Sequence, residues 1–273
     1  MPKDVDQRIL LVPPYRGAGY NFEPDKEPYY RKVLERMRES GQLNGVEVTI
    51  DPGVETSHRP ASRDDDLFDH IGVATLDRVK EIAATGEHDA IVILGAIDVE
   101  FHAMRAVLPV PVVHTVHSSL HLASLISERF SVIDVSDPQA ARLRRLAKGY
   151  GFGDKLAAVR PIGSSSTGAS PLLRLDDPMA EPEVQAMVDR VVECCREAIE
   201  TDRADSIIIT FTPLQVLEPV IRQRLDEAGY EEIPLIWILS ASVAMARALA
   251  DTGLMPARRS YPLDTLRAKP AWR

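Results

Sequence analysis

Two segments of this chain repeat the same order of features, and this repeat restricts the possible folds more than any other part of the sequence. Residues 88–126 read HDAIVILGAIDVEFHAMRAVLPVPVVHTVHSSLHLASLI, and residues 204–249 read ADSIIITFTPLQVLEPVIRQRLDEAGYEEIPLIWILSASVAMARAL. Each has an acidic residue, an apolar run, a short break, an amphipathic stretch, a proline-led apolar run and a helix opened by small residues. The repeat aligns Asp89 with Asp205, Gly95 with Phe211, Pro111 with Pro234 and His117 with Ser240.

Short apolar runs alternate with amphipathic stretches along the whole chain. We predict strands at 8–12, 46–50, 90–94, 110–115, 130–135, 156–162, 207–210 and 235–239. This alternation predicts parallel sheets with helices on both faces. With the repeat, it predicts an α/β fold of two pseudo-symmetric Rossmann-like halves whose strand ends meet at a shared, ligand-binding cleft. We expect the first half at 1–128, the second at 129–253, and a tail at 254–273 that can return to the first half.

Composition limits the partners and the compartment. The 273 residues carry a net charge of −9 with a pI of about 5.3, which argues against a nucleic-acid-binding surface but not against an anionic substrate. The only cysteines, Cys194 and Cys195, are adjacent in a stretch of helical periodicity and cannot readily pair, so we expect a reduced cytoplasmic protein. No apolar run approaches membrane-spanning length, so we expect no membrane partner. A homo-oligomer is possible, because the tail at 254–273 can reach a neighbouring subunit.

Three stretches of the sequence resemble a known superfamily. They are HDAIVILGAID at 88–98, PVVHTVHSSLHLASLISERFSVID at 111–134 and ECCREAIETDRADSIIIT at 193–210. They are similar to the aspartate/glutamate/hydantoin racemase superfamily, and most closely to its hydantoin racemase branch. The resemblance covers roughly residues 8–253. It implies catalysis by two cysteines, one after the apolar run of each half, but the matching positions here are Gly95 and Phe211.

The candidate site follows from the rule that ligands bind beyond the carboxyl ends of parallel strands. His117, placed at a strand-to-helix turn, is the first candidate for a general acid or base because imidazole titrates near neutral pH. Asp98, three residues after Gly95, is the second, although it is equally suited to capping a helix. We expect substrate contacts from the remaining loop residues: Tyr15, Arg16, Gly95, Ala96, Thr115, Ser118, Ser164, Ser165, Thr210, Phe211, Thr212 and Ser240.

Each group of candidates has a physical reason. Arg16 can pair with a substrate carboxylate, and the GSSSTG loop offers backbone N–H groups to an anion. The helices predicted to open at Ser118 and Ser240 offer positive ends, which pseudo-symmetry places opposite each other. Phe211 is expected to make one wall of the cleft apolar. Gly95 is expected to leave space where the other family thiol would be. The two cysteines lie on a helix away from the cleft, so we expect them not to be catalytic.

Three functions remain open from the sequence. The first is a cofactor-independent enzyme that acts on a small carboxylate or cyclic amide by a cysteine-free acid–base mechanism, as an isomerase, a lyase or decarboxylase, or a hydrolase. The second is a non-catalytic relative that binds a small molecule. The third is a metal-dependent hydrolase in which His114 and His117, with Asp98 or Asp51, hold a divalent ion.

Overall fold

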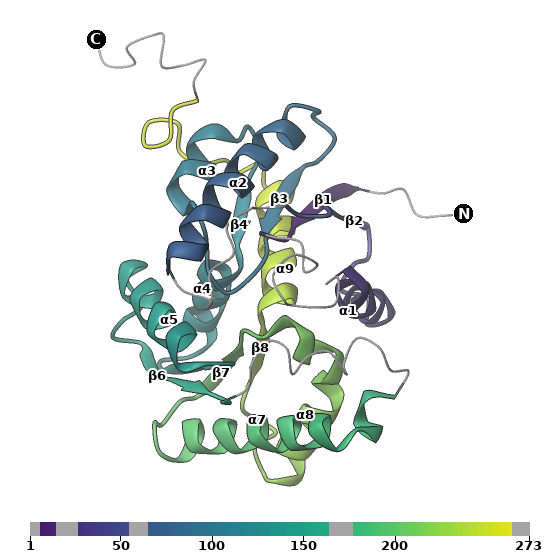
Figure 1. Cartoon of the computed structure of the whole chain (residues 1–273), viewed down its shortest axis with the longest axis vertical. Helices are drawn as coiled ribbons and strands as arrows, with labels where there is room; N and C mark the ends of the chain where they lie inside the picture. The colour runs from purple at the N-terminus through teal and green to yellow at the C-terminus, as the bar shows by residue number, and fades with distance from the viewer. Residues whose placement is uncertain (1–5, 15–26, 55–64, 164–176, 264–273) are drawn as a thin grey trace.

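The described residues form two four-stranded parallel sheets with the same strand order (Figure 1). The computed structural model describes residues 6–14, 27–54, 65–163 and 177–263. The first sheet has the order β2-β1-β3-β4 and the second has the order β6-β5-β7-β8. The strands are β1 (Gln7–Val12), β2 (Val46–Ile50), β3 (Ala90–Ile93), β4 (Val112–His114), β5 (Phe130–Asp134), β6 (Leu156–Pro161), β7 (Ser206–Ile209) and β8 (Leu235–Trp237). The predicted fold of two similar parallel α/β halves is confirmed.

Helices cover both faces of each sheet. The α-helices are α1 (Glu27–Glu39), α2 (Asp65–Ala83), α3 (Phe101–Val107), α4 (Thr115–Ile126), α5 (Asp137–Gly149), α7 (Pro182–Glu200), α8 (Glu218–Glu227) and α9 (Ile238–Asp251), with short 3-10 helices η2 (Pro178–Ala180) and η3 (Thr212–Leu217). On the first sheet, α2 and α3 pack on one face and α1 and α9 on the other. On the second sheet, α7 and α8 pack on one face and α4 and α5 on the other.

The sequence explains why these elements form. The strands at the centre of the sheets, such as β3 and β7, are buried on both faces and are therefore continuous apolar runs. Helix α7 buries residues at intervals of three and four from Val184 to Ala198, which is the stripe of an amphipathic helix. Helix α5 opens with Asp137-Pro138, where the missing N–H of proline costs no helical hydrogen bond.

Helices α4 and α9 exchange partners between the halves. Each follows the last strand of its own half, yet α4 packs on β7 and β8 whereas α9 packs on β1, β3 and β4. The two helices also pack on each other in the middle of the molecule (Figure 1). At their contact the Oγ atoms of Ser118 and Ser242 are 3.0 Å apart, and both residues are completely buried. The two sheets are therefore joined by a pair of shared helices.

The described part of the tail returns to the first half. The Arg258 guanidinium donates to the carbonyl oxygens of Leu108 (3.0 Å) and Arg105 (3.3 Å), at the end of α3. The Tyr261 hydroxyl lies 3.1 Å from Nδ1 of His102 on the same helix. This is the return that the sequence left open. In the described ranges, every helix is too short or too polar to cross a membrane.

Candidate active site

Gly95 and Phe211 occupy equivalent places at the carboxyl ends of equivalent strands. Gly95 is two residues beyond the end of β3, and Phe211 is two residues beyond the end of β7. Each of these strands is third in the chain order of its half and third in its sheet. Gly95 has a φ of 90°, which an L-residue rarely adopts, and the half-buried Phe211 packs against the apolar cluster under α7 and α8. The alignment of the repeat is confirmed at these positions.

Side chains from both halves fix the turn that follows β3. Four of its carbonyl oxygens accept hydrogen bonds from side chains, two of them on α5 of the second half. The bonds run from Thr115 Oγ1 to Gly95 (2.6 Å), from Gln139 Nε2 to Ala96 (2.5 Å), from Arg142 to Ile97 (2.9 Å) and from His114 Nε2 to Val99 (2.9 Å). The position that matches the first family thiol is thus held in place across the boundary between the halves.

Asp98 caps the amino end of α4. Its carboxylate accepts the backbone N–H groups of Val116 (3.0 Å) and His117 (2.8 Å), which the helix leaves unpaired, and the Tyr150 hydroxyl (3.1 Å). Asp98 is only 5% exposed and has a φ of 42°. Burial raises its pKa to about 6, although the three donors act in the opposite direction. Asp98 therefore combines a capping contact with a titration near neutral pH.

The His117 imidazole lies in a cluster of rings on the flank of α4. Its ring centroid is 4.7 Å from Phe101, 4.9 Å from Tyr150 and 4.4 Å from His121. Burial and the neighbouring His121 lower its pKa to about 3, so the ring is neutral at pH 7. Tyr150 follows the end of α5, a helix of 13 residues that starts next to the carboxyl end of β5. The length of α5, roughly 20 Å, separates Tyr150 from the carboxyl end of β5.

His114 is bound to the protein through both ring nitrogens. Nε2 donates to Val99 O, and Nδ1 lies 3.4 Å from the Arg105 guanidinium. The side chain is completely buried, and burial, together with the charge of Arg105, lowers its pKa to about 3. Asp51, another ligand considered for a metal, is paired with Arg78 (2.7 Å). The described residues contain no group of three or more His, Cys, Asp or Glu side chains able to hold a metal ion.

The second half contributes a buried carboxylate that the sequence reasoning missed. Asp134 is the last residue of β5 and is 3% exposed. The Thr210 hydroxyl, at the end of neighbouring β7, donates to this carboxylate and to Ile133 O, and the carboxylate also accepts the N–H of Val135 (2.6 Å). Thr210 directly precedes Phe211. The sequence signal for this site is an acidic residue that ends the apolar run FSVID.

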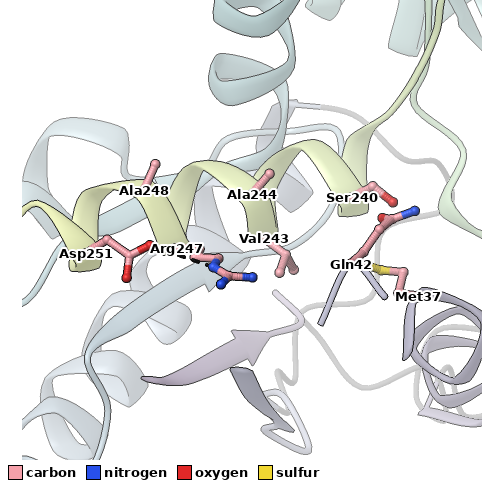
Figure 2. A pocket seen from close by; sticks show the side chains of 8 residues that line it. All are labelled: Met37, Gln42, Ser240, Val243, Ala244, Arg247, Ala248 and Asp251. Carbon is pink, nitrogen blue, oxygen red and sulfur yellow. Dashed lines mark ion pairs between the residues drawn. The ribbon is translucent and has the colours of Figure 1, made fainter. Parts of the chain in front are cut away.

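The structure separates the two serines that were expected to face each other. Ser118 meets Ser242 inside the helix pair and also bonds Thr115 O, so it does not line an open space. Ser240 is half-buried, and its Oγ accepts a hydrogen bond from Gln215 Nε2 (2.5 Å). It lines a cavity between α1 and α9, away from Ser118 (Figure 2). Thr212 is buried at the start of η3. Tyr15, Arg16, Ser164 and Ser165 lie outside the described residues.

The cysteines are in the core of the second half. Cys194 and Cys195 are both completely buried on α7. Burial raises the pKa of both thiols, so both are protonated at neutral pH. Both side chains therefore pack in the core rather than at a strand end.

Comparison with known proteins identifies the family. The family model described as Asp/Glu/Hydantoin racemase matches residues 27–246. The chain belongs to this family. Among curated proteins, it is 27% identical over 165 residues to a hydantoin racemase of Pseudomonas sp. strain NS671. That match spans 60% of this chain and 59% of the relative's length.

Solved structures show the same fold. An allantoin racemase from Klebsiella pneumoniae matches with a TM-score of 0.72 and 19% identity, covering 94% of this chain and 93% of its own. An allantoin racemase from Pseudomonas fluorescens matches with a TM-score of 0.71 and 22% identity, covering 94% and 96%. At these identities the likeness concerns the fold. The resemblance to the superfamily and to its hydantoin racemase-like branch is confirmed.

Proposed function

We propose that this chain is a cofactor-independent enzyme that moves a proton on a cyclic amide or a small carboxylate without a cysteine. Family membership supports a small-molecule substrate. The relatives are named for hydantoin and allantoin, which are both cyclic ureides, so a cyclic amide is the first choice. Isomerisation is the simplest reaction of this type. A decarboxylase would use the same group to protonate the carbanion left by loss of CO2, and a hydrolase would use it to deprotonate water that attacks the carbonyl carbon.

The observation that carries the proposal is the Asp134 carboxylate at the carboxyl end of β5. It is bonded to Thr210, the residue before the position of the second family thiol. A carboxylate can accept a proton from carbon and return it, which is the task of a general base. Thr210 fixes its orientation, and Phe211 contributes an apolar surface beside it. We therefore assign the acid–base step to Asp134. Gly95 does not leave the room that the sequence suggested, because a Cβ atom at this position would already lie 3.3 Å from Cγ of Pro14.

In this proposal Asp98 and His117 act through the turn after β3. Asp98 ties that turn to the first amides of α4, and the His117 ring packs against Tyr150, which bonds the same carboxylate. They are positioning residues here. The alternative, in which His117 and Asp98 are the acid and base themselves, stays a prediction of the sequence, and the same set of variants tests it.

The test is hydrogen exchange at carbon, because it detects proton abstraction whatever the final product. The protein is incubated in D2O with 5-substituted hydantoins, allantoin and small dicarboxylates, and loss of the C–H signal and any new product are followed by NMR. Asp134→Asn, which keeps the shape and an acceptor for Thr210, should slow exchange by about 10²–10⁴-fold. Asp98→Asn and His117→Asn should each slow it by less than about tenfold.

Circular dichroism and thermal unfolding of each variant separate chemistry from misfolding. If a folded His117→Asn or Asp98→Asn variant loses exchange while Asp134→Asn keeps it, the sequence-based assignment replaces ours. If no compound exchanges or is converted to a product, but some raise the melting temperature, the chain is a non-catalytic binding relative, and the enzyme proposal is wrong.

A further inference from the structure

Two histidines lie one turn apart on α4, the helix that packs beside α5 (Figure 1). His117 and His121 occupy positions i and i+4, so both side chains leave the same face of the helix. Both are half-buried, and their Nε2 atoms are 3.1 Å apart. Their ring centroids are 4.4 Å apart, with an angle of 64° between the ring planes. We call these two residues the α4 histidine pair.

The distance between the two nitrogens matches that of a chelated metal ion. An imidazole nitrogen binds a late divalent metal ion at about 2.0–2.1 Å. Where two such bonds form an angle of about 90–110°, as in octahedral or tetrahedral sites, the nitrogens are about 2.8–3.4 Å apart. The 3.1 Å of the α4 histidine pair falls within this range. An ion can therefore bind between the rings with only small movements of either.

The hydrogen bond that joins the pair is a weak one. A straight N–H···N bond of this length would place the centroids of two imidazoles about 5.4 Å apart, because each centroid lies more than 1 Å behind its nitrogen. The observed 4.4 Å shows that the bond is strongly bent. In the described part of the chain, neither Nδ1 atom has a hydrogen-bond partner. When an ion replaces the bond, the proton on Nε2 can therefore pass through water to Nδ1 of the same ring.

The surroundings hold both rings in place and keep them uncharged. The Tyr150 ring meets His117 edge-on, and the Phe152 ring meets His121 in the same way, each at 4.9 Å between centroids. Burial lowers the pKa of both imidazoles, that of His117 to about 3. Both are therefore neutral at pH 7, which is the form of imidazole that binds a metal ion. Little side-chain freedom is left to lose when the ion binds.

The donor atoms decide which class of ion the pair suits. Two imidazole nitrogens favour Zn²⁺, Ni²⁺ or Cu²⁺, whereas Mg²⁺ and Ca²⁺ need oxygen ligands. Among the described residues, no third His, Cys, Asp or Glu side chain completes the site, so water would fill the other positions. Two charges lie nearby and oppose each other: the Arg105 guanidinium, 3.5 Å from the Phe101 ring, and the Asp98 carboxylate, bonded to the His117 N–H.

We propose that the α4 histidine pair chelates one late divalent transition metal ion, with water in the remaining positions. This ligand set differs from the one considered from the sequence, because His114 uses both ring nitrogens within the protein. The site uses neither Asp134 nor Thr210, so it is separate from the proposed acid–base step. An ion held by residues one turn apart fastens the first part of α4, and therefore stabilises the folded protein.

The test uses the full chain, freed of metal with EDTA and then titrated with Zn²⁺. Calorimetry should show one ion bound per chain, and excess Zn²⁺ should raise the melting temperature. His117→Gln and His121→Gln should each weaken binding at least tenfold, which is about 1.4 kcal/mol. His102→Gln is the matched control, because this histidine is exposed on α3 and bonds Tyr261 instead of a second imidazole. It should bind Zn²⁺ as the wild type does.

Nitrogen-15 NMR of the wild-type protein identifies the ligands without any substitution. Zn²⁺ should shift the Nε2 signals of two of the seven histidines, His117 and His121, and leave the other five in place. The inference is overturned if Zn²⁺ does not bind in a saturable manner or shifts the signals of other histidines instead. It is equally overturned if folded His117→Gln and His121→Gln proteins bind the ion as tightly as the wild type.

Discussion

Replacing Gly95 with alanine should destabilise the protein through two separable effects. At a φ of 90°, any L-residue lies in the left-handed region, which costs about 1–2 kcal/mol. A Cβ atom at this position would also lie 3.3 Å from Cγ of Pro14 and 3.6 Å from Cγ1 of Ile97, and crowding of this kind adds about 1 kcal/mol or more. The expected loss is therefore about 2–3 kcal/mol, or roughly 4–12 °C in melting temperature.

Gly86 provides the matched control. It also has a positive φ, 68°, but an added Cβ would have no heavy atom within 4 Å. Gly86→Ala should therefore cost only the backbone part, about 1–2 kcal/mol. Urea unfolding followed by circular dichroism gives both values. If Gly95→Ala is no less stable than Gly86→Ala, the crowding at Pro14 is not real. Gly95→Cys should lose as much stability as Gly95→Ala, because the strain arises at Cβ and not at the thiol.

Two further predictions concern buried ionisable groups. Cys194→Ala with Cys195→Ala should leave any hydrogen exchange at carbon intact, apart from a loss of stability, and modification of either thiol that stops turnover of the folded protein would contradict this. Burial raises the pKa of Asp98 from 3.8 to about 6, so the folded protein holds this proton more tightly than the unfolded chain does. The stability that this proton contributes is present below pH 4 and is lost as the pH rises through 6, by up to about 3 kcal/mol. Urea unfolding at pH 4 and pH 7 should show that this loss disappears in Asp98→Asn, and an identical pH dependence in wild type and variant would refute it.

The sheets could be predicted from the sequence because their residues are set by local patterns. Central parallel strands are continuous apolar runs, and the repeat gives both halves the same order. The starts of α4 and α9 were placed too late, at Ser118 and Ser240, because each helix follows its strand directly, without a connecting loop. The first residues of α9 are as apolar as its strand, and Thr115 at the start of α4 was assigned to the strand.

The directions of the candidate side chains could not be predicted. The sequence spacing predicts that His117 lies near the start of a helix. It does not predict which sheet that helix covers. Because α4 packs on the opposite half, the flank that carries His117 turns toward Phe101 and Tyr150. Asp134 was missed for the related reason that it was counted as part of a strand. Its position beside Thr210 depends on the pairing of β5 with β7, which local sequence does not reveal.

The exchange of α4 and α9 means that neither half of the chain contains all of its own core. Leu239, Val243 and Ala246 of α9 complete the core of the first sheet, and Val116, Leu120 and Ala123 of α4 complete that of the second. A fragment cut between α4 and β5 would expose the apolar face of α4 and would leave only α1 on the face of its sheet that α9 also covers. If the repeat arose by duplication, the ancestral single-half protein needed a second copy of itself to fold, and fusion of the two genes turned a helix-swapped dimer into a single chain.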